Sequence, residues 1–489
     1  MNLKSIIENL NCSVEGNENL EVLHLTHNSK NIQKGSLYFC LVGGSVDGHS
    51  FASDAVESGA VGVVCQRPLN LKTTQIIVEN SRSAMATIAS NFYGNPSNDL
   101  KLITITGTNG KTTISYILQH ILKQAGFNVG LIGTSGNYIG EIKLPSTLTT
   151  PDPIELHALF SKMKQAGVQI VVMEASAHAI YLNKLEGVVA DVGMFTNLSQ
   201  DHLDFFNSFE DYALVKVGYF NSNNCRAVVT NLDDIYGKQI FDNNPLISVG
   251  YSLENPSDSF AMDVVLRENG SSFTANILDD ILKINFALSG RFNVYNSLAA
   301  ATAAKIIGVS AKDIVDGIAN VVSVDGRFNT IDCGNFSVVI DYAHTPDGLV
   351  NILKAIKEYC TARIITVFGC GGDRDKTKRF IMGKVAMQNS SYVVVTTDNP
   401  RSERPEDIIS QILEGVLSVS DKHFTAITQR EQAIWSAMRM AKKGDIVLIA
   451  GKGAEDYIEV HNVKHPFSDA ETVKKWLSKI QVAKGVGGC

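Results

Sequence analysis

Short apolar runs rich in Val and Ile alternate with amphipathic stretches along most of the chain. The apolar runs have the length and composition of buried strands. In the stretches between them, apolar side chains recur every three or four residues, as on the buried face of a helix. This alternation predicts an α/β fold with parallel sheets covered by helices. In the middle of the chain, strands are expected at 102–106, 129–132, 170–173, 192–196 and 227–230.

The alternation falls into three blocks, which predict three domains in a chain of 489 residues. Residues 1–98 should form a small α/β domain that ends at the Pro- and Asn-rich segment 95–98. Residues 99–322 should form a central domain like a P-loop ATPase, closed by a helix at 293–307. Residues 323–489 should form a Rossmann-like domain. Its strands are expected at 337–340, 364–368, 392–396 and 446–449.

The strand expected at 102–106 runs directly into a glycine-containing segment, and a helical pattern follows it. The segment is Gly107-Thr108-Asn109-Gly110-Lys111-Thr112-Thr113. At such a junction, backbone N–H groups and the positive end of the helix favour phosphate. Lys111 would bridge the outer phosphates and Thr112 would reach Mg²⁺. Ile105 occupies the position of the first Gly of the P-loop pattern, so we predict a shortened P-loop; a tight turn is the alternative.

Two further polar side chains follow expected strands and should lie near the glycine loop. Glu174 ends an apolar strand, where its carboxylate can hold Mg²⁺ across from Thr112. His202 lies between Asp201 and Asp204 after another strand. Ligands of such sheets bind at the carboxyl ends of the strands. The alternatives are a surface carboxylate and a structural histidine. By itself the pattern fits a nucleotide switch, a kinase or an ATP-driven ligase.

Composition narrows the class of protein. The chain is 44% hydrophobic and 19% charged, as in soluble enzymes, and its net charge of −7 argues against nucleic-acid or membrane-surface binding. The eight Cys are scattered without metal-ligand spacing, which suits a reducing cytoplasm. The first residues lack a signal-peptide pattern, and no apolar run is long enough to insert in a membrane. We expect a cytoplasmic, monomeric enzyme.

A series of motifs spans essentially the whole chain, and together they resemble the Mur ligase family. They are TGTNGKTT (106–113), TTPDP (149–153), Met173-Glu174 with Ser176 and His178, TNLSQDHLD (196–204), GRFNVYNSLAA (290–300), GRF (326–328), DYAHTPD (341–347), GCGGDRDKTKR (369–379), DNPR (398–401) and GKGAEDY (451–457). The resemblance is strongest to the members that add the third residue of the peptidoglycan stem peptide.

The resemblance implies ligase chemistry that uses ATP and Mg²⁺. ATP phosphorylates a carboxylate of the substrate, and an amine attacks the resulting acyl phosphate. Catalysis would fall to Lys111, Glu174, His202 and Lys216. The metal ligands would be Thr112, Glu174, His202 and a carbamylated Lys216, because CO₂ converts the amine into an anionic oxygen ligand. From sequence alone Lys216 would be an ordinary surface lysine of a helix.

The resemblance also assigns the substrates, UDP-muramoyl dipeptide and meso-diaminopimelate. The rest of ATP would contact Asn293, Asn296, Arg327, Asp341 and His344. The uridine end would contact Ser29, Gly44, Ser45 and Val46, and the muramoyl dipeptide would contact Thr149, Thr150, Ser176 and Lys184. The amino acid would contact Arg374, Asp398, Asn399, Pro400, Arg401, Gly451 and Glu455.

Arg401 bears most directly on the amino-acid substrate. Diaminopimelate carries a second carboxylate, which an Arg side chain can bind bidentately, and Glu455 would take the distal ammonium. On the uridine–muramoyl side the chain departs from the family pattern at Asn28, Lys30, Leu148, Ala177, Leu182 and Lys184, and near the amino acid at Ala454. Two alternatives therefore stay open, namely the same chemistry with lysine or a non-peptidoglycan carboxylate, and a P-loop nucleotide switch without ligase activity.

Overall fold

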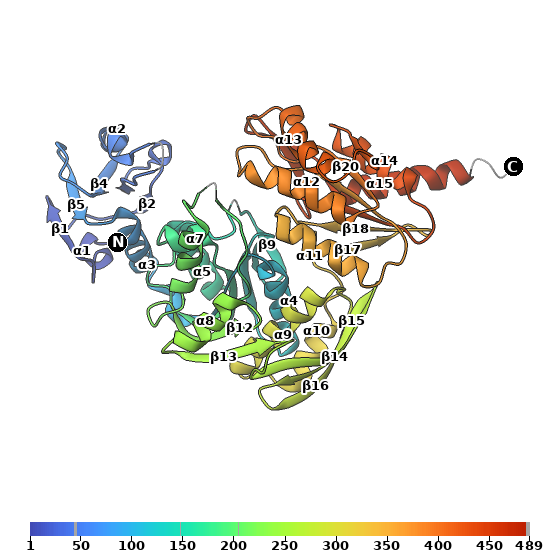
Figure 1. Ribbon diagram of the computed structural model, residues 1–489. Helices are drawn as coiled ribbons and strands as arrows, with labels where there is room; N and C mark the ends of the chain where they lie inside the picture. Colours follow the sequence, from blue (N-terminus) through green and yellow to red (C-terminus); the bar gives the residue numbers. More distant parts are fainter. Residues whose placement is uncertain (44–45, 147, 204, 486–489) are drawn as a thin grey trace.

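The computed structural model describes residues 1–43, 46–146, 148–203 and 205–485. Three sheets follow one another along the chain and form three separate lobes (Figure 1). The α/β fold class expected from the apolar runs is confirmed. The sheets occupy residues 12–78, 101–286 and 329–450. The domain boundaries proposed between them, after residues 98 and 322, stay a prediction.

The first lobe is a five-stranded sheet in the order β1-β5-β4-β3-β2, in which only β1 runs antiparallel to its neighbour. Apolar clusters cover both of its faces. Its elements are α1 (Leu3–Ile6), β1 (Cys12–Glu15), β2 (His24–Thr26), β3 (Ser36–Phe39), α2 (Ala52–Glu57), β4 (Ala60–Cys65), β5 (Thr74–Val78) and α3 (Ser81–Phe92).

The central lobe is an eleven-stranded sheet in the order β16-β15-β14-β13-β12-β11-β6-β10-β7-β8-β9. Its elements are β6 (Lys101–Thr106), α4 (Lys111–Gln124), β7 (Val129–Gly133), β8 (Gly136–Ile139), β9 (Ile142–Leu144), α5 (Pro153–Gln165), β10 (Ile170–Glu174), α6 (Ala177–Tyr181), β11 (Ala190–Phe195), α7 (Phe209–Gly218), β12 (Cys225–Asn231), α8 (Ile235–Asn243), β13 (Ile247–Ser252), β14 (Ser259–Arg267), β15 (Gly270–Ile277), β16 (Asp280–Phe286), α9 (Arg291–Ile306) and α10 (Ala311–Ala319).

Alternate side chains of β6 enter different cores of the central lobe. Ile103 and Ile105 pack with α4, α9 and α10 on one face. Leu102 packs with α5 on the other face. Because both faces are covered, the strand is apolar along its length, and this is why its position could be predicted.

The central sheet is parallel in its middle, as expected, and antiparallel strands extend it at both edges. In the middle of the sheet, the neighbouring strands β14, β13, β12, β11, β6, β10 and β7 pair in parallel. At one edge β8 and β9 are added antiparallel, and at the other edge β15 and β16 are added antiparallel. β15 and β16 alternate buried with more exposed residues, since one of their faces is not covered. A search for continuous apolar runs misses such strands. The helix expected to close this domain is α9, and α10 follows it.

The C-terminal lobe is a six-stranded sheet in the order β17-β18-β22-β19-β20-β21, with only β17 antiparallel. Helices α11 to α13 cover one face, and α14 and α15 cover the other. The elements are β17 (Asn329–Asp332), β18 (Ser337–Asp341), α11 (Pro346–Lys357), β19 (Ile364–Phe368), α12 (Thr377–Asn389), β20 (Tyr392–Val395), α13 (Pro405–Leu417), β21 (Phe424–Ala426), α14 (Arg430–Met440), β22 (Ile446–Ala450), the hairpin β23 (Tyr457–Val460) and β24 (Val463–Pro466), and α15 (Asp469–Gly485). Throughout the described residues, no helix combines the length and apolar character needed to cross a membrane.

Candidate active site

The glycine loop links β6 to α4 and can be made only with glycine at two positions. Gly107 and Gly110 have φ of 141° and 90°, which other residues rarely adopt. A Cβ atom on Gly107 would lie 1.9 Å from the Thr196 hydroxyl, and one on Gly110 would lie 2.6 Å from Oδ1 of Asn296. The loop is thus packed between β11 and α9, with its backbone at the N-terminus of α4.

Lys111, the first residue of α4, folds back over this loop. Its Nζ donates hydrogen bonds of 2.8 Å each to the carbonyl oxygens of Gly107 and Thr108. Burial lowers the pKa of Lys111, and the nearby Glu174 and Asp201 oppose that shift. The ammonium is therefore held at the loop where phosphate would sit, by groups that a phosphate can replace.

Thr112 and Glu174 meet as the sequence predicted. The Thr112 hydroxyl donates to Oε1 of the buried Glu174 over 3.0 Å. Thr134, in the loop after β7, donates to Glu174 through both its backbone N–H and its hydroxyl, each over 3.0 Å. From the C-terminal lobe, Arg327 reaches the Thr112 hydroxyl over 3.3 Å. The site therefore joins two lobes at the ends of parallel strands.

This oxygen pair fits a magnesium ion, whereas the use of His202 and carbamylated Lys216 as further ligands stays a prediction. Mg²⁺ prefers carboxylate and hydroxyl oxygen, which Glu174 and Thr112 supply within 3.0 Å of each other. Lys216 would supply an oxygen ligand only as the predicted carbamate. Among the described residues, no three His, Cys, Asp or Glu side chains gather as a metal site.

Lys216 is a buried residue of α7, not a lysine on a helix surface. Its Nζ donates to the carbonyl of Gly107 over 2.6 Å and faces the Tyr212 ring at 5.1 Å. Burial lowers the pKa of Lys216 well below its ordinary value, and the neighbouring Lys111 lowers it further. The surroundings thus favour the neutral amine, the form that reacts with CO₂.

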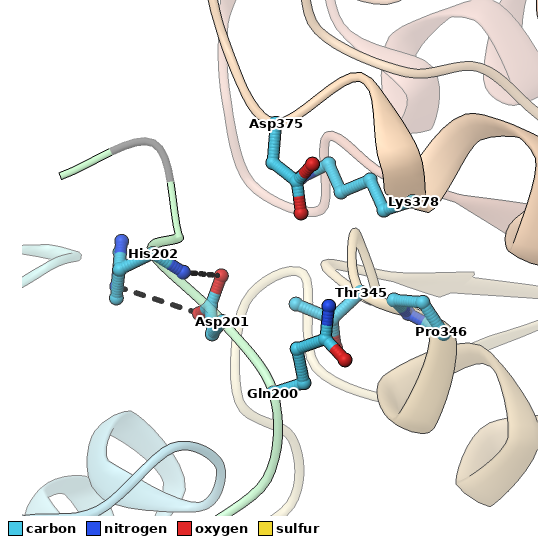
Figure 2. A pocket seen from close by; sticks show the side chains of 7 residues that line it. All are labelled: Gln200, Asp201, His202, Thr345, Pro346, Asp375 and Lys378. Atoms are coloured by element: carbon cyan, nitrogen blue, oxygen red, sulfur yellow. Dashed lines mark hydrogen bonds and ion pairs between the residues drawn. The ribbon is translucent and has the colours of Figure 1, made fainter. Parts of the chain in front are cut away.

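His202 lies beside Asp201 at the border between the central and C-terminal lobes (Figure 2). Its Nε2 is 3.4 Å from Oδ2 of Asp201, and its ring stands edge-on to His178 at 4.8 Å. Burial lowers the pKa of His202 to about 4, so the imidazole is neutral near pH 7. Asp204, its other acidic neighbour in sequence, lies outside the described residues.

A pocket between the two lobes opens beside His202. Figure 2 shows Gln200, Asp201 and His202 on one segment of the central lobe, with side chains of the C-terminal lobe on the other side of the pocket. Those side chains are Thr345, Pro346, Asp375 and Lys378. Burial raises the pKa of Asp201, but His202, His344 and Lys378 together lower it below its ordinary value, so this carboxylate stays ionised. The polar groups of two lobes therefore converge on one space next to the phosphate-binding loop.

The residues expected to contact the rest of ATP fall in two groups, one on α9 and one in the C-terminal lobe. Asn296 borders Gly110, and its side-chain amide donates to Oδ1 of Asn293 over 3.0 Å. Arg327 stacks on the Tyr342 ring at 4.5 Å. The list is completed by Asp341, which accepts hydrogen bonds from the backbone N–H groups of Phe328 and Ala343, and by His344, whose pKa burial lowers. Both groups approach the glycine loop, through Asn296 and Arg327.

The first lobe contains a pocket of about 430 Å³. Ser29 and Val46, both expected to contact uridine, lie in its lining. Gly44 and Ser45 lie outside the described residues. The remaining lining residues are His27, Asn28, Tyr38, Leu41, Gly43, Gly48, Phe51, Arg82 and Asp152. The last of these comes from the central lobe, so the pocket opens toward the predicted muramoyl site.

The predicted muramoyl contacts lead from that pocket to Glu174. Thr149 shares a hydrogen bond of 3.1 Å with Thr134. The Thr150 hydroxyl donates to the Glu174 carbonyl over 2.8 Å, and Ser176 lies beside it. Lys184 forms an ion pair of 2.8 Å with Asp152. Together these side chains mark a path from the first lobe to the phosphate-binding loop.

The predicted amino-acid pocket combines three loops of the C-terminal lobe. The backbone N–H of Asn399 donates to its neighbour Asp398, and its side-chain amide donates to Oε2 of Glu455 over 2.9 Å. Asp398 also borders Gly451, where a Cβ atom would lie 2.6 Å from its Oδ2. Pro400 borders Gly372 closely enough to exclude a side chain there. These residues are thus brought together, as expected, although their roles stay a prediction.

Arg401 and Arg374 lie on neighbouring loops of this pocket. Nη1 of Arg401 donates to the carbonyl of Gly372 over 2.7 Å. Gly371 packs between them, 3.0 Å from Nη1 of Arg401 and 3.8 Å from Cγ of Arg374 when measured from its ideal Cβ position. Both side chains therefore border Gly371.

A buried ion pair that the sequence did not reveal fastens these loops together. Arg379 of α12 donates two hydrogen bonds of 2.8 Å to the carboxylate of Glu403. Glu403 also accepts from the Asp373 backbone over 2.7 Å, and the Asp373 carboxylate accepts from Ser402. Arg379 is fully buried, three residues before the buried Met382. The sequence signal for this burial is a charged residue at the helical spacing of a buried apolar residue.

Lys452 is a second residue missed from sequence. Its buried Nζ donates to Glu455 over 2.8 Å and to Asn399 over 3.1 Å. One carboxylate oxygen of Glu455, the expected partner of the distal ammonium, is thus already paired. Lys452 belongs to the motif GKGAEDY, but the motif does not show that its side chain is buried.

Three family models match the chain in succession. "Mur ligase family, catalytic domain" matches residues 21–93, "Mur ligase middle domain" matches 105–304, and "Mur ligase, glutamate ligase domain" matches 326–453. Each match covers one of the three sheets or most of it. The matched segments contain the glycine loop and most of the other loops described above, and the third match ends at residue 453, before Glu455.

Curated relatives match over the full length. The chain is 41% identical to UDP-N-acetylmuramoyl-L-alanyl-D-glutamate–2,6-diaminopimelate ligase 1 of Clostridium acetobutylicum, over 98% of this chain and 100% of the relative. It is also 41% identical to UDP-N-acetylmuramoyl-L-alanyl-D-glutamate–2,6-diaminopimelate ligase of Clostridium perfringens, over 97% of this chain and 99% of the relative.

Solved structures agree in fold. A structure of UDP-N-acetylmuramoyl-L-alanyl-D-glutamate–2,6-diaminopimelate ligase superposes with a TM-score of 0.70 at 29% identity, covering 98% of this chain and 99% of that one. The MurF ligase from Thermotoga maritima in complex with ADP gives a TM-score of 0.63 at 20% identity, with coverage of 93% and 97%. At that lower identity the likeness concerns the fold alone.

Proposed function

Because the chain belongs to the Mur ligase family, we propose that it joins meso-diaminopimelate to UDP-N-acetylmuramoyl-L-alanyl-D-glutamate with hydrolysis of ATP. The product is a precursor of peptidoglycan. The observation that carries the choice of amino acid is the pocket at the C-terminal lobe. Arg401 and Glu455 flank Asn399 there, and they match the carboxylate and the ammonium at the distal end of diaminopimelate.

We propose that the glycine loop and Lys111 bind the phosphates of ATP. The loop supplies backbone N–H groups at the start of α4, and Lys111 supplies a positive charge at the same place. Arg327 adds a second positive charge from the C-terminal lobe. Phosphoryl transfer depends mostly on alignment and on neutralising the charge of the transferred group. These cations therefore serve the first half of the reaction.

Thr112 and Glu174 are the residues that would hold Mg²⁺. When bound, the ion would neutralise charge on the phosphate oxygens. Thr134 fixes the carboxylate of Glu174 through two hydrogen bonds, so the pair is oriented before any ligand binds. We place His202 at the edge of this site, where its neutral ring can act as a ligand.

We propose that Lys216 reacts with CO₂, as the family resemblance implies. Its nitrogen would bond to the carbon of CO₂ and lose a proton to solvent, which turns a buried amine into an anionic carbamate. The lowered pKa of Lys216 supports this proposal, because the free amine is the nucleophile. The carbamate would also balance the positive charge of Lys111 nearby.

The reaction itself would proceed in two steps across the interlobe site. A carboxylate oxygen of the muramoyl dipeptide attacks the γ-phosphorus, and ADP leaves. The amine of diaminopimelate then attacks the acyl phosphate, loses a proton, and expels inorganic phosphate. Thr149, Thr150 and Ser176 lie between the first-lobe pocket and Glu174, so they would deliver the carboxylate to the loop. Arg374, Arg401 and Glu455 would deliver the amine.

Release of inorganic phosphate tests this function. The purified protein is given ATP, Mg²⁺ and UDP-muramoyl dipeptide, and then one amino acid at a time. We expect release with meso-diaminopimelate, and release with lysine at least a hundredfold less efficient, because one buried charge pair is worth roughly that factor. Preference for lysine would overturn the amino-acid assignment, and no release with either would point to another carboxylate substrate.

A further inference from the structure

Glu459 lies against Arg401 although the two residues belong to different segments. Glu459 is on β23, in the hairpin that follows the motif 451–457. Its Oε2 forms an ion pair with Nε of Arg401 at 3.3 Å, and each side chain is 21% exposed. No part of the family resemblance described above includes this residue. The resemblance therefore does not explain why this carboxylate faces Arg401, the residue proposed to bind substrate.

The backbone of the hairpin also holds Arg401. The N–H of Arg401 donates to the carbonyl of Glu459 over 3.0 Å, and the N–H of His461 donates to the carbonyl of Arg401 over 2.8 Å. The N–H of Glu459 donates in turn to Oδ1 of Asn399 over 3.0 Å. Arg401 has φ of 51°, which is unusual for a residue with a side chain. The hairpin thus holds Arg401 in a conformation that it would otherwise rarely adopt.

These contacts use one side of the guanidinium and leave the other available. Glu459 lies on the Nε side, and the Gly372 carbonyl takes one hydrogen of Nη1. Within the described part of the chain, Nη2 has no hydrogen-bond partner. A carboxylate binds most strongly to two parallel N–H groups of an arginine. The Nη1–Nη2 edge therefore still has donors for a bidentate partner.

We propose that Glu459 is a positioning residue that turns Arg401 so that its Nη1–Nη2 edge receives the distal carboxylate of the amino-acid substrate. This inference rests on the proposed function. Glu459 does not contact the substrate; it limits the rotation of a long side chain that would otherwise lose entropy on binding. Its effect should therefore depend on Arg401 and on the second carboxylate of diaminopimelate.

Steady-state kinetics on the full-length protein test the proposal. Glu459→Ala should raise KM for meso-diaminopimelate by roughly tenfold to a hundredfold, as expected for a misplaced binding group. KM for ATP, kcat and the efficiency with lysine should change little, because none of them involves the second carboxylate. Glu459→Gln should lie between Ala and wild type, since it keeps an oxygen near Nε. Glu459→Gln also tests the proposal if the Ala variant fails to fold.

Two controls separate positioning from a structural role. Glu471→Ala removes an equally charged residue from an exposed ion pair on α15 and should leave all constants unchanged. Added to Arg401→Ala, Glu459→Ala should cause no further loss with diaminopimelate. Losses that multiply, or a lower KM in Glu459→Ala, would overturn the proposal. If wild-type protein itself does not use diaminopimelate, the proposed function fails instead.

Discussion

The glycine loop, proposed to bind phosphate, and the predicted amino-acid pocket are assembled in different ways. The loop is one continuous segment, residues 107–113, whose backbone and first lysine form most of the site. The pocket draws on three segments, 369–379, 398–403 and 451–459, which are joined by the ion pairs Arg379–Glu403 and Arg401–Glu459. Charged side chains join the segments of the pocket, whereas the shape of the loop depends on backbone conformations that glycine adopts.

This difference predicts two kinds of defect. A change in the loop should impair the reaction with every amino acid to the same degree, because each needs the same phosphoryl transfer. A change in the pocket should alter the choice between amino acids, because only the pocket contacts them. Ratios of efficiencies therefore separate the two sites better than rates do.

Lys111→Ala should have the largest effect. Loss of one charge-stabilising donor at such a site costs about a hundredfold to a thousandfold in turnover. We expect at least that loss with diaminopimelate and an equal factor with lysine, while thermal melting stays close to wild type. Lys101→Ala, at the exposed start of β6, is the matched control. A folded Lys111→Ala protein with near-normal turnover would remove the phosphate assignment.

Lys216→Ala should be nearly as damaging, by a factor on the order of a hundred, because the proposed carbamate would supply a metal ligand and a buried negative charge. If the lysine acts as a carbamate, short carboxylic acids should restore part of the activity by supplying the missing oxygens. Rates are measured with increasing formate or acetate in the variant and in Lys111→Ala. Rescue should be confined to the first; equal rescue in both would argue against the carbamate.

Glu403→Gln should have a smaller effect that depends on pH. Hydrogen bonds from Arg379 lower the pKa of Glu403 from 4.5 to about 2, so the ionised carboxylate stabilises the folded state. That stabilisation is complete above the unfolded pKa of 4.5 and is lost as pH falls toward 2. At pH 7 the variant should be less stable by roughly 1–3 kcal/mol, the usual range for a hydrogen bond to a charged group.

Urea unfolding at pH 7, 5 and 3 checks this prediction, because the gap between wild type and variant should shrink at the lowest pH. Glu471→Gln, which removes an exposed carboxylate, should show no such trend. A gap that stays constant with pH would mean that Glu403 contributes through packing and not through its charge.

The same difference explains how much the sequence could predict. The loop was found from its own residues, since glycine, lysine and threonine must be consecutive there. The buried strands of the sheets were found because both of their faces are covered. β15 and β16 were missed because they are half exposed, and the domain boundaries stay a prediction.

The pocket needed three-dimensional information. Arg401 and Glu455 could be proposed from motifs, but Arg379, Lys452 and Glu459 contact Glu403, Asn399 and Arg401 only when separate segments meet. Ion pairs between segments leave no periodic signal in a sequence. Lys216 shows a related limit: a lysine is expected on a helix surface, and only the fold shows that this one is buried with Tyr212 and Ala213, against Gly107.

The selectivity of Arg401→Ala tests most directly whether the pocket recognises the second carboxylate. Breaking a buried, charge-assisted pair on one side costs about 3–5 kcal/mol. The efficiency with meso-diaminopimelate should therefore fall by roughly two to three orders of magnitude. The efficiency with lysine should change little, so selectivity should be lost because the efficiency with meso-diaminopimelate falls. If both efficiencies fall by the same factor, Arg401 supports the fold or the closed state and does not bind the carboxylate.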